Sequence, residues 1–251
     1  MSTPLHLASS KGDDETVQLL IKHGADVQAK DKSQSTPLHI ASSEGDVKIV
    51  KLLIEYGADV HVRDQTQSTP LHLASSKRDA EAARLLIKHE ANIHAHDQNR
   101  LTPLHCASLG GNIETVQLLI ENKADVHARD RSQSTPLHLA LSMRNSETSQ
   151  LLIENGADVH AWDQSQSTPL HLALFVGDTK TFQLLIEHGA DVRARNKDQS
   201  TPLHLASSML YAKLLIEHGA DVHARDGSQS TPLHLASSKG DAEEPMTHTL
   251  S

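Results

Sequence analysis

The stretch TPLHLASS, residues 3–10, decides how the rest of this chain is read. Its Thr-Pro-Leu-His opening returns along the sequence, starting at Thr3, Thr36, Thr69, Thr102, Thr135, Thr168, Thr201 and Thr231. The first six steps are 33 residues long and the last is 30. A period this regular predicts repeated units, each of which packs only on its neighbours.

Each unit is expected to contain two helices and a connecting finger. Thr3 is the expected N-cap of a short first helix, Pro4 takes its first position, and His6 stands where a capping-box partner reaches back to the cap. We therefore predict that the eight histidines of this motif are structural. A second helix is expected over residues 14–23, and Gly24 follows it, where a left-handed backbone is favoured. Residues 25–31 are predicted to be extended and to lead through a turn to the next threonine.

With its 33-residue period and Thr-Pro-Leu-His motif, the chain resembles the ankyrin repeat family over almost its whole length. The resemblance implies an all-α repeat solenoid of stacked helix-turn-helix units with β-hairpin-like fingers. It further implies an L shape, in which fingers and first helices line a concave binding face. We expect one array over residues 1–244, with seven full repeats and a half repeat at 231, and a C-terminal tail over residues 245–251.

Several positions depart from the family pattern. Glycine usually stands two residues before the threonine, but here the residues are Gln34, Gln67, Arg100, Gln133, Gln166, Gln199 and Gln229. Either these turns adopt another geometry or the array carries a small repeated strain. The glycine that ends the second helix is replaced by Glu90 and Lys123, and the glycine between the helices by Arg78 and Arg144. We therefore expect repeats three to five to be less stable than the first two.

The seventh repeat and the two ends are the least regular parts. The seventh repeat lacks three residues where the turn between its helices should fall, so residues 207–212 are hard to assign. Neither end shows the polar capping unit that arrays normally carry, and Pro245 falls inside the expected last helix. The chain is thus expected to be a piece of a longer array, or a complete array with frayed ends.

The composition excludes several function classes. With 32 acidic and 23 basic residues the formal charge is −9, which disfavours nucleic acid and anionic membranes as partners. The single cysteine, Cys106, fits a reducing compartment, and no signal peptide or membrane-spanning run is present, so we expect the cytoplasm, with the nucleus as the alternative. No phosphate loop, nucleophile elbow or zinc-protease motif occurs. We expect a monomeric protein that is not an enzyme and needs no cofactor.

A row of finger histidines raises a metal hypothesis. Its members are His61, His94, His127, His160 and His223. Stacked repeats lie roughly 8–10 Å apart, whereas zinc holds each nitrogen at about 2.0–2.1 Å, so the row is poorly spaced for shared coordination and we predict no metal site. A pH-sensitive surface is a milder version of the same idea.

Residues that break the repeat are the candidates for binding. The ends of the first helices change from polar to apolar in repeats four to seven, and Trp162 replaces a residue that is otherwise Lys, Arg or His. Interfaces are enriched in Trp, Met, Phe and Arg. Our candidate partner-binding residues are Trp162, Phe175, Met143, Leu109, Met209, Arg129 and Arg131. Arg195 also edges this set, whereas Leu141 and Leu174 are assigned to the core.

These observations favour a non-catalytic scaffold or adaptor that binds a protein through its concave face. The alternative is the recognition arm of a longer enzyme, of the kinase or ubiquitin-ligase type. A metal- or pH-responsive histidine array is a third reading. The family resemblance alone does not name the partner.

Overall fold

The chain folds into paired helices that form two compact units, Met1–Ala157 and Asp158–Ser251. The computed structural model describes residues 2–77 and 80–240. Within these residues there are fifteen helices and no strand, so the all-helical class is confirmed and the hairpin character of the fingers is not. The predicted tail, residues 245–251, and Arg78 lie outside the described residues.

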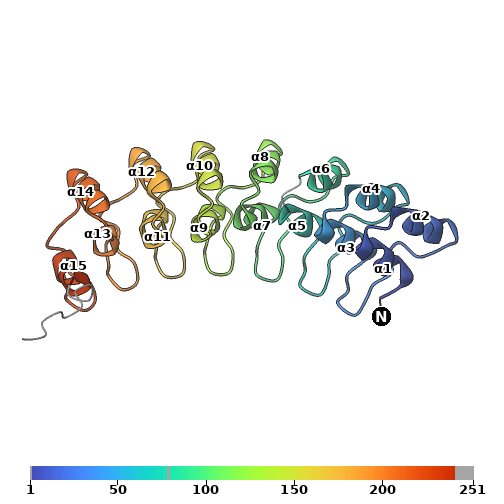
Figure 1. Ribbon diagram of the computed structural model, residues 1–251, viewed down its shortest axis with the longest axis horizontal. Helices are drawn as coiled ribbons and strands as arrows, with labels where there is room; N and C mark the ends of the chain where they lie inside the picture. Colours follow the sequence, from blue (N-terminus) through green and yellow to red (C-terminus); the bar gives the residue numbers. More distant parts are fainter. Residues whose placement is uncertain (1, 78–79, 241–251) are drawn as a thin grey trace, which may run out of the picture. The chain divides into compact units, whose positions relative to one another are not determined.

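The first unit holds five helix pairs in two rows (Figure 1). The first helices are α1 (Pro4–Lys11), α3 (Pro37–Glu44), α5 (Pro70–Ser75), α7 (Pro103–Gly110) and α9 (Pro136–Ser142). The second helices are α2 (Asp14–Lys22), α4 (Val47–Glu55), α6 (Glu81–Lys88), α8 (Ile113–Glu121) and α10 (Ser146–Glu154). Each first helix packs on the first helix of the next repeat, and the core lies between the two rows, where Leu38, Leu53 and Leu71 are fully buried.

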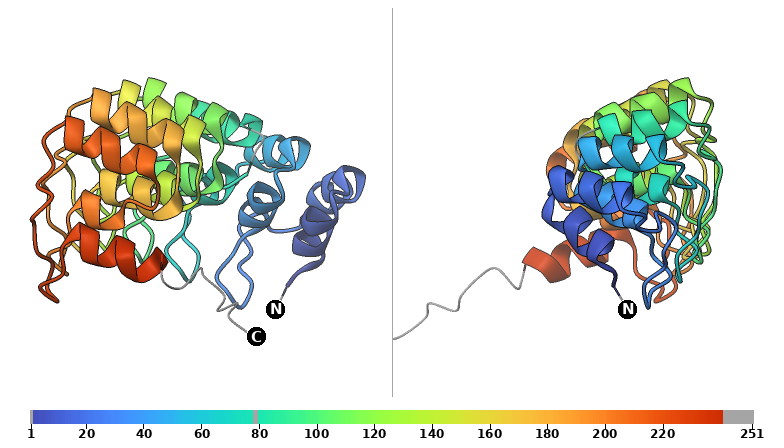
Figure 2. Two further views of the ribbon diagram at one scale, coloured as in Figure 1. Left: turned by 60° about the vertical axis from the view of Figure 1, so that its left-hand side comes forward. Right: turned by 90° about the vertical axis from the view of Figure 1, so that its right-hand side faces the viewer.

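The second unit repeats this plan. Its first helices are α11 (Pro169–Val176), α13 (Pro202–Leu205) and α15 (Pro232–Gly240), and its second helices are α12 (Thr179–Glu187) and α14 (Met209–Glu217). Helix α13 packs on both α11 and α15. In both units the fingers project beyond the row of first helices, on the side away from the second helices (Figures 1 and 2).

Every first helix begins with the predicted threonine–histidine cap. In the second repeat the backbone N–H of Thr36 donates to Nδ1 of His39 over 3.1 Å, and the same bond occurs in all eight repeats. Because Nδ1 accepts, the ring is neutral and carries its proton on Nε2. That nitrogen donates to the carbonyl of Ser68, 29 residues further on, over 3.1 Å. The ring therefore caps one helix and ties it to the finger that leads to the next, which confirms its structural role.

The turns keep their left-handed backbone without glycine. All seven non-glycine residues before the threonines have positive φ, between 55° at Gln166 and 63° at Gln67 and Gln229. The same holds for Glu90, Lys123 and Arg144. Of the two alternatives that the sequence left open, the structure shows the repeated strain.

The seventh repeat shortens its first helix and keeps its second. Helix α13 is only four residues long, and Ser208 then caps α14 by accepting from the backbone of Tyr211. Met209 therefore lies in the first turn of α14, so its assignment to the end of a first helix was wrong. The ring of Tyr211 packs edge-on against Phe182, with centroids 4.9 Å apart.

Candidate functional site

The fingers are ordered by a repeated hydrogen-bonded turn. In the first finger Oδ1 of Asp31 accepts from the backbone N–H groups of Ser33 and Ser35, and the N–H of Asp31 donates back to the carbonyl of Ser35. Neighbouring fingers are joined by a backbone bond, as from Gln65 to the carbonyl of Ser33 over 2.8 Å. These bonds hold each finger in a fixed conformation, and they give Asp31 and its equivalents a structural role.

An arginine holds the strained turn in several fingers. Nη1 of Arg63 donates to the carbonyl of Gln67, the residue at positive φ, and to the carbonyl of His96 in the next finger. Nη1 of Arg195 likewise donates to the carbonyls of Gln199 and Arg225, over 2.9 and 2.7 Å. We call this arrangement the arginine clamp. The sequence analysis did not predict the arginine clamp, although the basic residues that recur at this finger position were a signal for it.

Four of the predicted partner-binding residues lie in the first unit. Leu109 is the next-to-last residue of α7 and is 41% exposed, and Met143 caps the end of α9 and is 55% exposed. Because α7 and α9 pack on each other, these two apolar side chains belong to adjacent helix ends. Arg129 is partly buried and donates to the carbonyl of Gln133, whereas Arg131 is exposed.

The other three lie in the second unit. Phe175, near the end of α11, is 79% exposed, and Met209, at the start of α14, is 83% exposed. Trp162 stands in the finger before α11 and is 52% exposed. Leu141 and Leu174 are buried, which confirms their assignment to the core.

Trp162 lines a hollow of about 340 Å³. Its other lining residues are His160, Gln166, Thr168, Ala194 and Arg195, from two successive fingers. Neither Phe175 nor Met209 is among them. The structure thus places Trp162 in a concave site with Arg195, while Phe175 and Met209 stand on exposed helix ends.

Burial tunes the titratable groups of the first helices. It lowers the pKa of His39, His72, His105 and His171, because the charged ring would lose its hydration. Burial also raises the pKa of the Cys106 thiol to about 12. Cys106 is therefore a protonated, unreactive thiol at neutral pH, as expected for a small packing residue.

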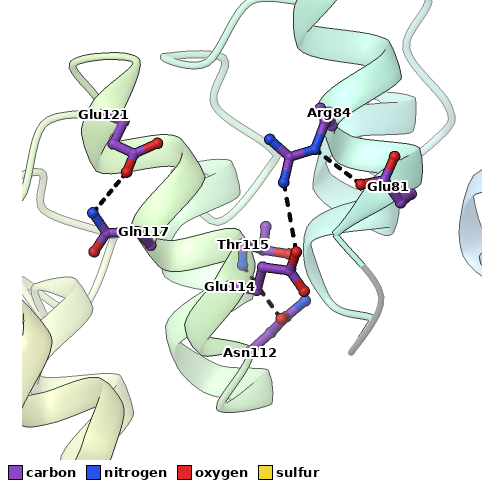
Figure 3. A network of polar contacts seen from close by, with 7 residues as sticks. All are labelled: Glu81, Arg84, Asn112, Glu114, Thr115, Gln117 and Glu121. Atoms are coloured by element: carbon purple, nitrogen blue, oxygen red, sulfur yellow. Dashed lines mark hydrogen bonds and ion pairs between the residues drawn. The ribbon is translucent and has the colours of Figure 1, made fainter.

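Polar and charged side chains connect the second helices α6 and α8. Figure 3 shows Arg84 of α6 paired with Glu81 of the same helix at 3.0 Å and with Glu114 of α8 at 3.5 Å. Beside this pair, Asn112 caps α8 by accepting from the backbone of Thr115. Exposed pairs of this kind contribute little stability.

Among the residues that the structure describes, no three His, Cys, Asp or Glu side chains gather in a way that would hold a metal ion. In the finger row, the backbone N–H of His61 donates to Oδ1 of Asp59, and His127, His160 and His223 repeat this bond. His94 makes the same bond to Asn92. The five finger histidines thus occupy equivalent turn positions, one per repeat.

A family model described as ankyrin repeats (3 copies) matches residues 1–64, 57–130, 125–196 and 177–244. Together with the helix pairs and their caps, this match shows that the chain belongs to the ankyrin repeat family. A comparison with curated proteins found no match. In the described part of the chain, no helix has the length and apolar character needed to cross a bilayer. Ankyrin repeats are in general modules for protein–protein interaction.

Proposed function

We propose that this chain is a non-catalytic scaffold or adaptor that captures a protein partner on its fingers and first-helix ends. The observation that carries the proposal is the exposure of Trp162, the chain's single tryptophan, in a hollow between two ordered fingers. Tryptophan and arginine are the residues most enriched among interface hot spots. When a partner covers a half-exposed aromatic ring on an ordered surface, burial of the apolar ring contributes favourable binding free energy.

Each unit, taken by itself, also carries exposed apolar side chains at helix ends that we include in the binding surface. Leu109 and Met143 belong to it in the first unit, and Phe175 and Met209 in the second. In this proposal Arg129 and Arg131 supply positive charge beside the apolar residues. Arg129 also donates a hydrogen bond to the carbonyl of Gln133 in its own finger. We further propose a monomer in a reducing compartment, the cytoplasm or the nucleus, because one cysteine serves no disulfide framework.

The test is Trp162→Ala, with Ile216→Ala as the matched control. Ile216 is also apolar and 48% exposed, but it lies on α14 in the row of second helices. Partners retained by the immobilised full chain are identified by mass spectrometry and then titrated individually. Truncating a hot-spot aromatic costs about 2 kcal/mol or more, so Trp162→Ala should weaken capture about tenfold or more. Ile216→Ala should leave capture unchanged.

The melting temperature separates binding from folding. Substitution of an exposed residue changes the free energy of unfolding by less than about 0.5 kcal/mol, so Trp162→Ala should melt within a few degrees of the parent chain. If Trp162→Ala unfolds the neighbouring repeats, the ring is a packing residue and the proposal is wrong. Unchanged capture by a stable Trp162→Ala variant would place the binding surface elsewhere.

A further inference from the structure

The arginine clamp is interrupted where tryptophan takes its place. At the equivalent finger position Arg63 and Arg195 each reach two carbonyls, one in their own finger and one in the next. Such a bond draws neighbouring fingers together. The indole of Trp162 has one N–H donor and a flat apolar ring in place of the five donors of a guanidinium. Trp162 therefore offers a binding wall where an arginine would bridge the fingers.

The hollow at this position combines apolar and positive walls. The ring of Trp162 and the side chain of Ala194 supply apolar surface, and Arg195 supplies a permanent charge. Thr168 is 9% exposed and, like Gln166, adds polar atoms to the wall. At about 340 Å³ the hollow is at the small end of ligand sites, a size that suits one or two side chains.

Among the described residues, Arg195 forms no ion pair with a carboxylate. None of the residues that line the hollow is acidic, and Nη1 of Arg195 donates to two neutral backbone carbonyls, those of Gln199 and Arg225. The neighbouring Asp163 is engaged in its own turn, where Oδ1 accepts from the N–H groups of Ser165 and Ser167. A guanidinium held in place by two carbonyls is oriented in advance for an anionic group.

We propose that this hollow binds an acidic peptide segment of the partner protein, with an apolar side chain against Trp162 and an aspartate or glutamate carboxylate on Arg195. The inference rests on the proposed scaffold function and names the chemistry of its partner. Charge complementarity selects the occupant, because a basic segment would meet the like charge of Arg195.

The experiment selects random peptides on the full chain and, in parallel, on Trp162→Arg. This variant restores at position 162 the residue type that forms the clamp at positions 63 and 195. Peptides enriched on the parent chain alone should carry Asp or Glu beside an apolar residue. Because Trp162 is the only tryptophan, its fluorescence reports directly on occupancy. Replacing the acidic residues of a selected peptide by Asn and Gln should weaken binding about tenfold or more.

Arg195→Gln should weaken the same peptides about tenfold, and Arg63→Gln is its matched control. Arg63 makes the same double clamp in the first unit, so its loss disturbs a finger without touching the hollow. Peptides that depend on Trp162 but show no preference for acidic residues would overturn the inference and leave the scaffold function standing. Peptides that bind both chains equally would also overturn it. If no peptide is enriched and no protein partner is retained, both proposals fail.

Discussion

At the scale of single residues, the histidine of the Thr-Pro-Leu-His motif makes two structural hydrogen bonds. His39 accepts from the backbone of Thr36 through Nδ1 and donates to the carbonyl of Ser68 through Nε2. Both bonds require the neutral ring, because a protonated Nδ1 would face the N–H of the threonine with a second donor. Protonation of the capping histidine would therefore remove the hydrogen bond that it accepts from the threonine backbone.

Acid should destabilise the array through these histidines. Burial lowers the pKa of His39, His72, His105 and His171 in the folded chain, so below their ordinary pKa of about 6.5 the unfolded chain binds more protons. Their stability contribution is present above that pH and is lost as the pH falls toward the folded pKa values. Each histidine then lowers the free energy of unfolding by at most about 1.4 kcal/mol per pH unit.

Urea unfolding between pH 8 and pH 5 measures this effect. His105→Gln is the control, since glutamine keeps an acceptor at the capping-box position and does not titrate. Its unfolding free energy should depend on pH less steeply than that of the parent chain below about pH 6.5, by at most about 1.4 kcal/mol per pH unit. Parallel curves for the two chains would contradict the assignment.

A second residue-scale effect is the strain of the finger turns. Gln67 has φ of 63°, a conformation that costs L-residues roughly 1–2 kcal/mol and glycine almost nothing. Because glycine also gains freedom in the unfolded chain, Gln67→Gly should raise the free energy of unfolding by only about 0.5–1 kcal/mol. The control is Gln65→Gly, two residues away and outside the set of positive-φ residues, which should not stabilise. Chemical denaturation compares them, and a less stable Gln67→Gly would count against the strain.

At the scale of elements, the repeats differ in how completely their helices are packed. Leu104 at the start of α7 is fully buried, whereas Leu233 at the same position of α15 is 74% exposed. Helix α13 is shorter than the other first helices, at four residues. In an array each unit is stabilised by its neighbours, so poorly packed units open first.

Native-state hydrogen exchange should resolve this difference. Amides of α15 and of the four-residue α13 should exchange through low-energy openings, and those of α3 and α4 in repeat two through openings near the free energy of global unfolding. Repeats three to five, with Glu90, Lys123 and Arg144 at positive φ, should fall between these limits. Uniform protection from α1 to α15 would show that the array opens as one unit, contrary to this expectation.

At the scale of the whole molecule, the repeat places the same kinds of surface side chain once in each unit and does not gather them at one point. The formal charge of −9 is spread over the chain, and the finger histidines occur once per repeat. Among described residues no three candidate ligands come together. Such a surface is unsuited to a metal ion, which needs several ligand atoms within about 2–3 Å of one point. It is suited to a long partner that contacts successive fingers.

Zinc at modest excess should therefore leave the melting temperature nearly unchanged, since a metal stabilises only when the folded state binds it. The informative control replaces His61, His94, His127, His160 and His223 together by glutamine. A rise of several degrees in the parent chain that disappears in this variant would establish the histidine row as a metal site.

The sequence by itself determined the period, the paired helices and the caps, because each depends on residues a few positions apart. Thr36, Pro37 and His39 specify a helix start without reference to the rest of the chain. Proline and glycine placed the turns, and the periodic apolar residues placed the core. The one misplaced element, at Met209, came from a deletion that removed the local turn signal.

Only the tertiary structure decided how the repeats are tied together and where the surface is hollow. The bond from His39 to Ser68 joins residues 29 apart, and that from Arg63 to His96 joins residues 33 apart. From the sequence Trp162 was a single exception in a row of cations, and in the structure it meets Arg195 across a hollow. The physical reason is that a clamp or a hollow exists only between stacked fingers, and stacking brings together residues that are one full repeat apart.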